Sequence, residues 1–234
     1  MIYIINKNMP YDMIEKLKEK DDLIIPTLDI NCIPSSVSTH PDIQIHQADN
    51  NTIFCAPEVY EYYKEQILDR IKIICGSVGL GGTYPDDCAY NISVIGKYVL
   101  CNTKAADKKI LDYHNSKNRV IVHTNQGYTK CNICIINQNT VITEDIGLHN
   151  TIIRNCPDIN SHLIPKGEVL LEGFEFGFIG GASFTNYKTV VWFGDIKRLS
   201  YYKKIEEVLA KNNMESLCLS KSGLLDLGGI ICLP

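Results

Sequence analysis

The sequence predicts an α/β protein built as a closed ring of five strand-strand-helix-strand units. Four segments share one order of small polar residues, an alternating strand, a turn and a second strand, and they align on Thr52, Tyr98, Thr140 and Thr189. The intervals between these positions are 46, 42 and 49 residues, a regularity typical of repeat architectures. A fifth unit is complete only when residues 223–234 are joined to residues 1–27. We therefore expect the two ends of the chain to pair and close the ring.

Strand and helix signals alternate within each unit. Apolar residues recur at helical spacing in residues 10–20, 57–70, 105–115, 147–155 and 197–212. Each helix precedes a short apolar run, which predicts a strand covered on both faces; the runs are residues 23–25, 71–75, 120–122, 162–164 and 216–219. Pairs typical of hairpin turns separate the two leading strands, at residues 50–51, 96–97, 138–139 and 186–187.

These signals predict one domain of five units. The units span about residues 36–77, 86–124, 126–165 and 176–220, and the fifth joins 223–234 to 1–27. With 234 residues and 45% hydrophobic content the chain can bury a sizeable core. No linker or low-complexity tract marks a boundary between domains.

Composition excludes several classes of partner. The formal net charge of -4 and the scattered basic residues argue against a nucleic-acid surface. No apolar run approaches 18 residues and the first residues lack a signal-peptide pattern, so we expect a cytoplasmic protein with no membrane partner. The ten cysteines lie mostly in apolar strand-like runs, which indicates buried thiols in a reducing compartment. Cys131 and Cys134 form a lone CxxC that is expected in a strand, with a structural role.

A ring of five such units resembles the pentein fold, the α/β propeller of the guanidino-group-modifying enzymes, and most of all the uncharacterised bacterial families assigned to it. The final residues GGIICLP, which place Cys232 after two glycines, are similar to the Gly-Gly-x-x-Cys that carries the nucleophile of arginine deiminases. His40-Pro41-Asp42 resembles the family's His-x-Asp, although it lies in the first unit and not the third. The resemblance implies a thiol-dependent C-N hydrolase or amidinotransferase-like enzyme. Cys232 would be its nucleophile, His40 or His46 its acid and base, and Asp42, Asp86 and Asp87 its orienting carboxylates.

In such a ring, the first strand of each unit and the turn before it face the central channel. Polar residues concentrate there and supply the candidate substrate-binding set: His46, Asp86, Asp87, Asn125, Lys130 and Ser183. Asp42, Gln44 and His46 are expected on one strand face, because alternate residues of a strand point the same way. That face is either solvent-exposed or part of a site for a small guanidinium- or amide-bearing molecule.

A metal is the weaker interpretation of the same residues. His40, His46 and Asp42 could supply three ligands, with Asp86 or Asp87 completing the shell. Their spacing on one strand matches no recognised metal signature, so no metal or other cofactor is predicted.

Two classes of function remain open from the sequence. One is a hydrolase that uses Cys232; the other is a non-catalytic binding or assembly module on the same ring, since a fold alone does not define function. They differ in one expectation, which is that an enzyme brings Cys232, a histidine and an aspartate together in one cleft. The sequence does not indicate the substrate, the partner or the oligomeric state.

Overall fold

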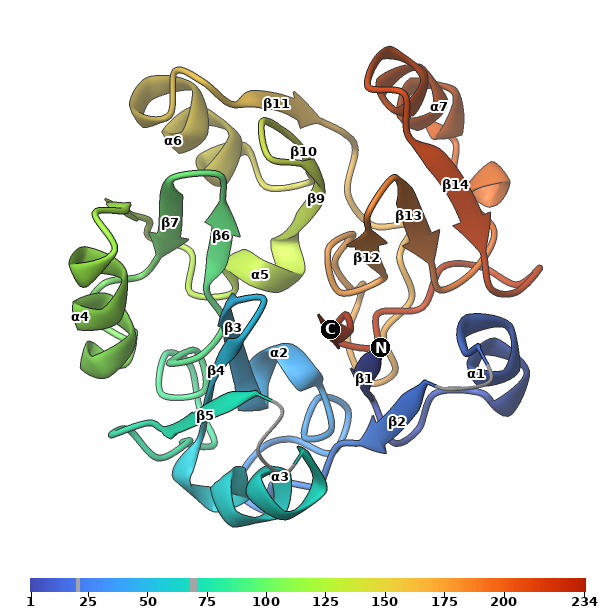
Figure 1. Ribbon diagram of the computed structural model, residues 1–234. Helices are drawn as coiled ribbons and strands as arrows, with labels where there is room; N and C mark the ends of the chain where they lie inside the picture. Colours follow the sequence, from blue (N-terminus) through green and yellow to red (C-terminus); the bar gives the residue numbers. More distant parts are fainter. Residues whose placement is uncertain (20–21, 68–70) are drawn as a thin grey trace.

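The computed structural model describes residues 1–19, 22–67 and 71–234. Within these residues five three-stranded sheets surround a central axis (Figure 1). The first two sheets, written from the axis outwards, are β3 (Ile45–Asp49), β4 (Thr52–Cys55) and β5 (Lys72–Cys75), then β6 (Ser93–Ile95), β7 (Tyr98–Cys101) and β8 (Val120–His123). The next two are β9 (Ile133–Asn137), β10 (Thr140–Thr143) and β11 (Asn160–Leu163), then β12 (Ser183–Asn186), β13 (Thr189–Trp192) and β14 (Glu215–Cys218).

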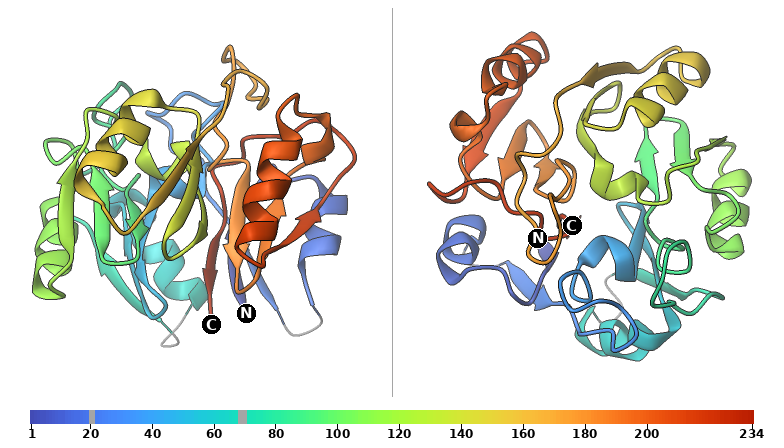
Figure 2. Two further views of the ribbon diagram at one scale, coloured as in Figure 1. Left: turned by 90° about the horizontal axis from the view of Figure 1, so that it is seen from above. Right: turned by 180° about the vertical axis from the view of Figure 1, so that it is seen from behind.

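The fifth sheet is made from both ends of the chain. It consists of β15 (Ile231–Leu233), β1 (Ile2–Ile5) and β2 (Leu23–Pro26). β15 pairs antiparallel with β1, and Tyr3 lies opposite Cys232; β1 then pairs parallel with β2. Figure 2 shows the two chain ends side by side at one end of the ring axis. The predicted closure by the termini is confirmed, whereas the assignment to one domain stays a prediction.

A helix connects the second and third strands of each unit, as the sequence predicts. These helices are α1 (Tyr11–Leu17), α3 (Tyr60–Ile67), α4 (Lys108–Ser116), α6 (Ile146–Asn155) and α7 (Tyr202–Lys211), with short 3-10 turns at Pro57–Val59 and Ile196–Arg198. Aspartates cap several of them: Asp107 accepts from the backbone N–H of Lys109, and Asp145 from that of Leu148. The predicted helix ends at residues 20 and 68–70 lie outside the described residues.

Three predictions about the strands are wrong in detail. The third strands are not covered on both faces, because most of their side chains are exposed or half-buried; β14 is largely exposed. The turn between β12 and β13 lies one residue later than predicted, with Tyr187 at a positive φ of 51°. Residues 41–44 form the short helix α2 (Pro41–Gln44), so Asp42 and Gln44 do not alternate with His46 along a strand. Pro41 occupies the first turn of α2, where its missing N–H costs no hydrogen bond.

A second short helix precedes β9. It is α5 (Thr129–Asn132), and it places Cys131 in a helix and Cys134 in a strand, so the CxxC does not lie in one strand. The segments before the innermost strands are therefore short helices or turns.

Apolar side chains pack between neighbouring sheets and form the core. Trp192 and Ile142 belong to the core between the third and fourth sheets, and Tyr3 and Phe184 to the core between the fourth and fifth. Among the described residues we find no helix with the length and apolarity that a bilayer crossing requires.

Candidate functional site

Hydrogen bonds from backbone N–H groups join all five units where the segments before the innermost strands meet. The N–H of Asp42 donates to the carbonyl of Gly228 at 3.2 Å. The Gly229 N–H donates to Gly181 O at 2.8 Å, and Gly181 N–H to Cys131 O at 2.9 Å. Asn91 Oδ1 accepts from the N–H of Lys130 at 2.8 Å. These bonds hold the side chains of the five segments in one buried polar cluster.

Two buried carboxylates form the centre of this cluster. Asp42 is 1% exposed, and neither of its carboxylate oxygens has a hydrogen-bond partner in the described part of the chain. Asp226 is also buried, and it accepts from the N–H of Phe178 at 2.8 Å and of Gly228 at 3.0 Å. Burial and then the charge of Asp226 raise the pKa of Asp42 well above its usual value, and Lys130 and the Asn91 side chain offset this in part. Burial likewise raises the pKa of Asp226.

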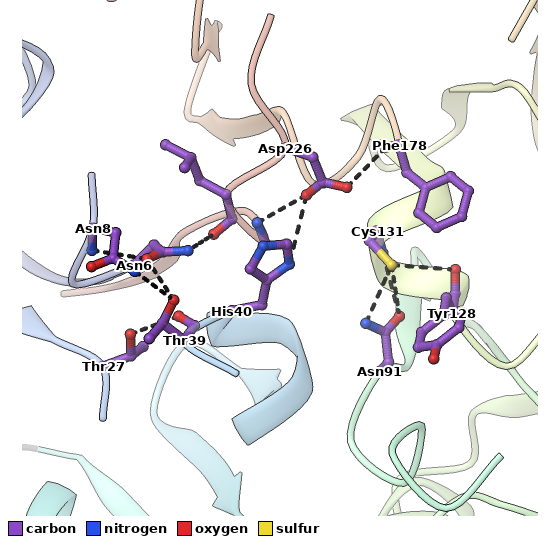
Figure 3. A network of polar contacts seen from close by, with 12 residues as sticks. Asn6, Asn8, Thr27, Thr39, His40, Asn91, Tyr128, Cys131, Phe178 and Asp226 are labelled. Atoms are coloured by element: carbon purple, nitrogen blue, oxygen red, sulfur yellow. Dashed lines mark hydrogen bonds and ion pairs between the residues drawn. The ribbon is translucent and has the colours of Figure 1, made fainter. Parts of the chain in front are cut away.

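His40 lies against Asp226 on the side of the first unit (Figure 3). Its Nδ1 is 3.8 Å from Asp226 Oδ1. Burial lowers the pKa of His40 although Asp226 raises it, so the ring is neutral at pH 7. Gly228 has a φ of +73°, and a Cβ there would lie 2.4 Å from the Cβ of His40. Glycine is therefore required where the chain passes His40.

A cavity of about 1020 Å³ runs between the innermost strands from their hairpin turns to Lys130. Lys130 is half-buried, and its ammonium group forms no hydrogen bond or ion pair with the residues that the structure describes. Asp42 and Asp226 do not line this cavity. Lys130 thus separates the open cavity from the buried carboxylates.

Cys232 borders the same cavity from β15. Its thiol is half-buried beside Tyr3, and burial raises its pKa to about 11 although the hydrogen bond with Tyr3 lowers it in part. Its carbonyl accepts from Gln47 Nε2 at 2.8 Å. The described contacts of Cys232 include neither His40 nor His46, because His40 lies at Asp226 in the closed cluster. His46 and Asp49 line the same cavity as Cys232, but no histidine or aspartate of the described residues is hydrogen-bonded to its thiol.

The other thiols near the axis are also protonated at neutral pH. Burial, followed by the charges of Asp42 and Asp226, raises the pKa of Cys131 well above its usual value. Burial and Asp87 raise the pKa of Cys88. A thiolate nucleophile needs the opposite environment, a cation or an imidazolium nearby.

His46 reaches the cavity wall, but its ring is paired with that of His114. Nε2 lies 2.8 Å from Nε2 of His114, and burial lowers the pKa of His46 although the Ile92 backbone offsets this in part. His114 Nδ1 accepts from Arg119 at 3.0 Å. Burial and the charge of Arg119 lower the pKa of His114 to about 4. The pair is therefore neutral.

The remaining predicted residues are dispersed. Asp86 and Asn125 are exposed, and the Asn125 carbonyl accepts from Tyr84. Asp87 is buried and accepts from the Tyr128 hydroxyl at 2.5 Å. Ser183 Oγ donates to the Ile179 carbonyl. Within residues 1–19, 22–67 and 71–234 no cluster of His, Cys, Asp and Glu could hold a metal ion.

Sequence reasoning missed Glu144, which follows β10 and is only 8% exposed. It accepts from the Ile179 N–H at 2.9 Å, next to the Phe178 N–H that Asp226 binds. Burial raises the pKa of Glu144 to about 7. Neither helical nor strand periodicity predicts that Glu144 is buried, since its hydrogen-bond partner Ile179 lies in the fourth unit.

The ring and its axial polar cluster define a pentein-fold protein. DDAH from Pseudomonas aeruginosa, in a mutant complexed with citrulline, is similar with a TM-score of 0.57 and 10% identity over 94% of this chain and 91% of that one. SxtG, a saxitoxin-pathway amidinotransferase from Microseira wollei, has a TM-score of 0.54 with 9% identity, covering 94% and 88%. Agmatine deiminase from C. jejuni has a TM-score of 0.50 with 12% identity, covering 94% and 76%. At this identity the likeness shows the fold alone.

The sequence itself places the chain in a particular family. Residues 4–231 match the profile of a family of unknown function (DUF6873), and the chain belongs to that family. No curated protein matches the sequence.

Proposed function

We propose that this protein binds a small cationic metabolite, a guanidine or an amine, through the carboxylates of Asp42 and Asp226 at the ring axis. The observation that carries the proposal is the Asp42 carboxylate, which is 1% exposed and has no hydrogen-bond partner among the described residues. Burying an ionised carboxylate without partners is costly. A bound cation would supply the missing charge and donors.

The charges around Asp42 support a cation. Asp42 and Asp226 repel each other when both are ionised, and Lys130 offsets the charge of Asp42 only in part, so the ionised cluster carries an excess negative charge. A planar guanidinium can donate two parallel hydrogen bonds to a carboxylate. The fold is shared with proteins described as a dimethylarginine dimethylaminohydrolase, an amidinotransferase and an agmatine deiminase, which is consistent with a guanidine ligand.

Thermal melting with a panel of guanidines, amines and neutral amides tests the proposal. At least one cation should raise the melting temperature of the wild type, and Asp42→Asn should abolish that rise. Asp112→Asn, which neutralises an exposed aspartate on α4, should leave it intact. The proposal fails if no cation stabilises the wild type, or if Asp42→Asn responds as the wild type does.

A C-N hydrolase that uses Cys232 is the second candidate, because this thiol borders the open cavity. Its raised pKa means that a ligand or a structural change must first generate the thiolate. Release of ammonia or amine from the same panel would support it, provided that Cys232→Ser abolishes turnover and Cys218→Ser on the edge strand β14 does not. Binding of a ligand without turnover would favour the non-catalytic binding module over the hydrolase.

A further inference from the structure

We propose that the cavity between the innermost strands is a separate anion-binding site, for a small metabolite that carries carboxylate or phosphate groups, with the Lys130 ammonium as its deepest contact. The cavity of about 1020 Å³ lies on the other side of Lys130 from Asp42 and Asp226. Its volume is at the upper end of the range of small-molecule sites.

Among the charged side chains that line the cavity, positive charges outnumber negative ones. Lys117, Arg119 and Lys130 contribute positive charge, and the lining carboxylate is that of Asp49. Asp49 already accepts from the Tyr113 hydroxyl at 2.5 Å and from the Asn51 N–H at 2.9 Å. It is therefore engaged with the wall, while the Lys130 ammonium has no partner among the described residues.

Arg119 extends the positive surface towards the hairpin turns. Its Nη1 donates to the Ala48 carbonyl at 2.6 Å and to His114 Nδ1 at 3.0 Å, which fixes the guanidinium. Its Nη2 and Nε have no partner in the described part of the chain, and they can donate to an oxyanion. His46, also on this wall, is neutral because burial holds its pKa well below the usual value, so it adds no further positive charge.

This site differs in sign from the proposed cation site. An anion on Lys130 cannot neutralise Asp42, and a cation between the carboxylates cannot satisfy Lys130. Lys130→Met should therefore weaken anion binding and strengthen cation binding, because it removes a positive charge beside Asp42. Asp42→Asn should abolish cation binding and retain anion binding. Failure of one proposal is thus distinguishable from failure of the other.

The test uses citrate and pyrophosphate as probes, each against sodium chloride at matched ionic strength. Either probe should raise the melting temperature and bind in calorimetry, and Lys130→Met should weaken binding at least about tenfold, the loss of one charge-assisted contact. Lys108→Met, which neutralises an exposed lysine outside the cavity, should bind as the wild type does. Citrate alone would indicate carboxylate ligands, and pyrophosphate alone phosphate ligands.

A second readout remains informative if Lys130→Met does not fold. Acetylation of wild-type Lys130 by an amine-reactive ester, followed by peptide mass spectrometry, should be slowed by the probe, whereas acetylation of Lys108 should not. The proposal is overturned if neither probe stabilises the wild type beyond the chloride control, or if the folded Lys130→Met variant binds with wild-type affinity. Equal acetylation of Lys130 with and without probe would overturn it as well.

Discussion

Asp42 and Asp107 are both buried aspartates with opposite environments. Burial alone would raise the pKa of Asp107, but hydrogen bonds from the backbone N–H groups of Ser77, Val78 and Lys109 lower it. Asp42 has no such donors, and its pKa is raised. Asp107 fixes a helix start, whereas Asp42 has an unsatisfied carboxyl group that a ligand can use.

Asp42→Asn should stabilise the ligand-free protein, increasingly so as the pH rises. The folded pKa of Asp42 lies above the unfolded value near 3.9. The favourable contribution of Asp42 to the free energy of unfolding is thus complete below the unfolded pKa. It is lost as the pH rises through the folded pKa. At pH 8 we expect a gain of about 1–3 kcal/mol, the cost of an unsatisfied buried group.

Urea unfolding at pH 4, 6 and 8 measures this difference. The gap between Asp42→Asn and the wild type should widen with pH, and Asp112→Asn should show no such trend. A destabilised Asp42→Asn protein at pH 8 would mean that Asp42 has an internal partner.

The sequence indicated Asp42 and Lys130 as polar residues of the first strand of a unit or of the turn before it, and the structure brings both to the axis. It could not indicate which polar groups pair, because the partner of each side chain lies in another unit. His46 illustrates the limit: its engagement with His114 depends on how α4 packs against β3. Whether Cys232 acts as a nucleophile likewise depends on neighbours that sequence spacing does not reveal.

At the scale of elements, short helices and glycine turns position the site. Repeat spacing predicted the fifteen strands of the described sheets and their order closely. It did not predict α2 and α5, since four residues are too few to show a helical period. These two helices place Asp42 and Lys130 at the axis.

Gly228→Ala should be more destabilising than Gly167→Ala. Both glycines have positive φ, +73° and +102°, which costs another residue roughly 1–2 kcal/mol. At Gly167 a Cβ would meet nothing within 4 Å, whereas at Gly228 it would clash with His40. Urea unfolding should show the larger loss for Gly228→Ala, and melting with a cation should show weaker binding. Equal losses of stability would indicate that the His40 side chain can move away from the added Cβ at no cost.

At the scale of the molecule, closure by both ends was predictable because an incomplete unit at each end implies one shared sheet. The pairing of Tyr3 with Cys232 is the resulting contact. The identity of the ligand was not predictable, since members of one fold carry different sites.

Removing residues 223–234 should abolish cooperative unfolding. The deletion takes away β15, leaves β1 with an unpaired edge, and exposes the core that contains Tyr3 and Phe184. Removal of the exposed Pro234 alone is the control, since it leaves β15 intact. Circular dichroism on heating should show a sharp transition only for the control. A sharp transition in the protein that lacks residues 223–234 would show that the chain folds cooperatively without closure of the ring by its two ends.

The most direct test of the central claim is the proton balance of cation binding. Calorimetry of the best-binding guanidine or amine at pH 6, in two buffers with different ionisation enthalpies, measures the protons released. The wild type should release protons as Asp42 and Asp226 ionise around the cation, and Asp42→Asn should neither bind nor release. Binding by Asp42→Asn at wild-type affinity, or no binding by the wild type, would contradict the account.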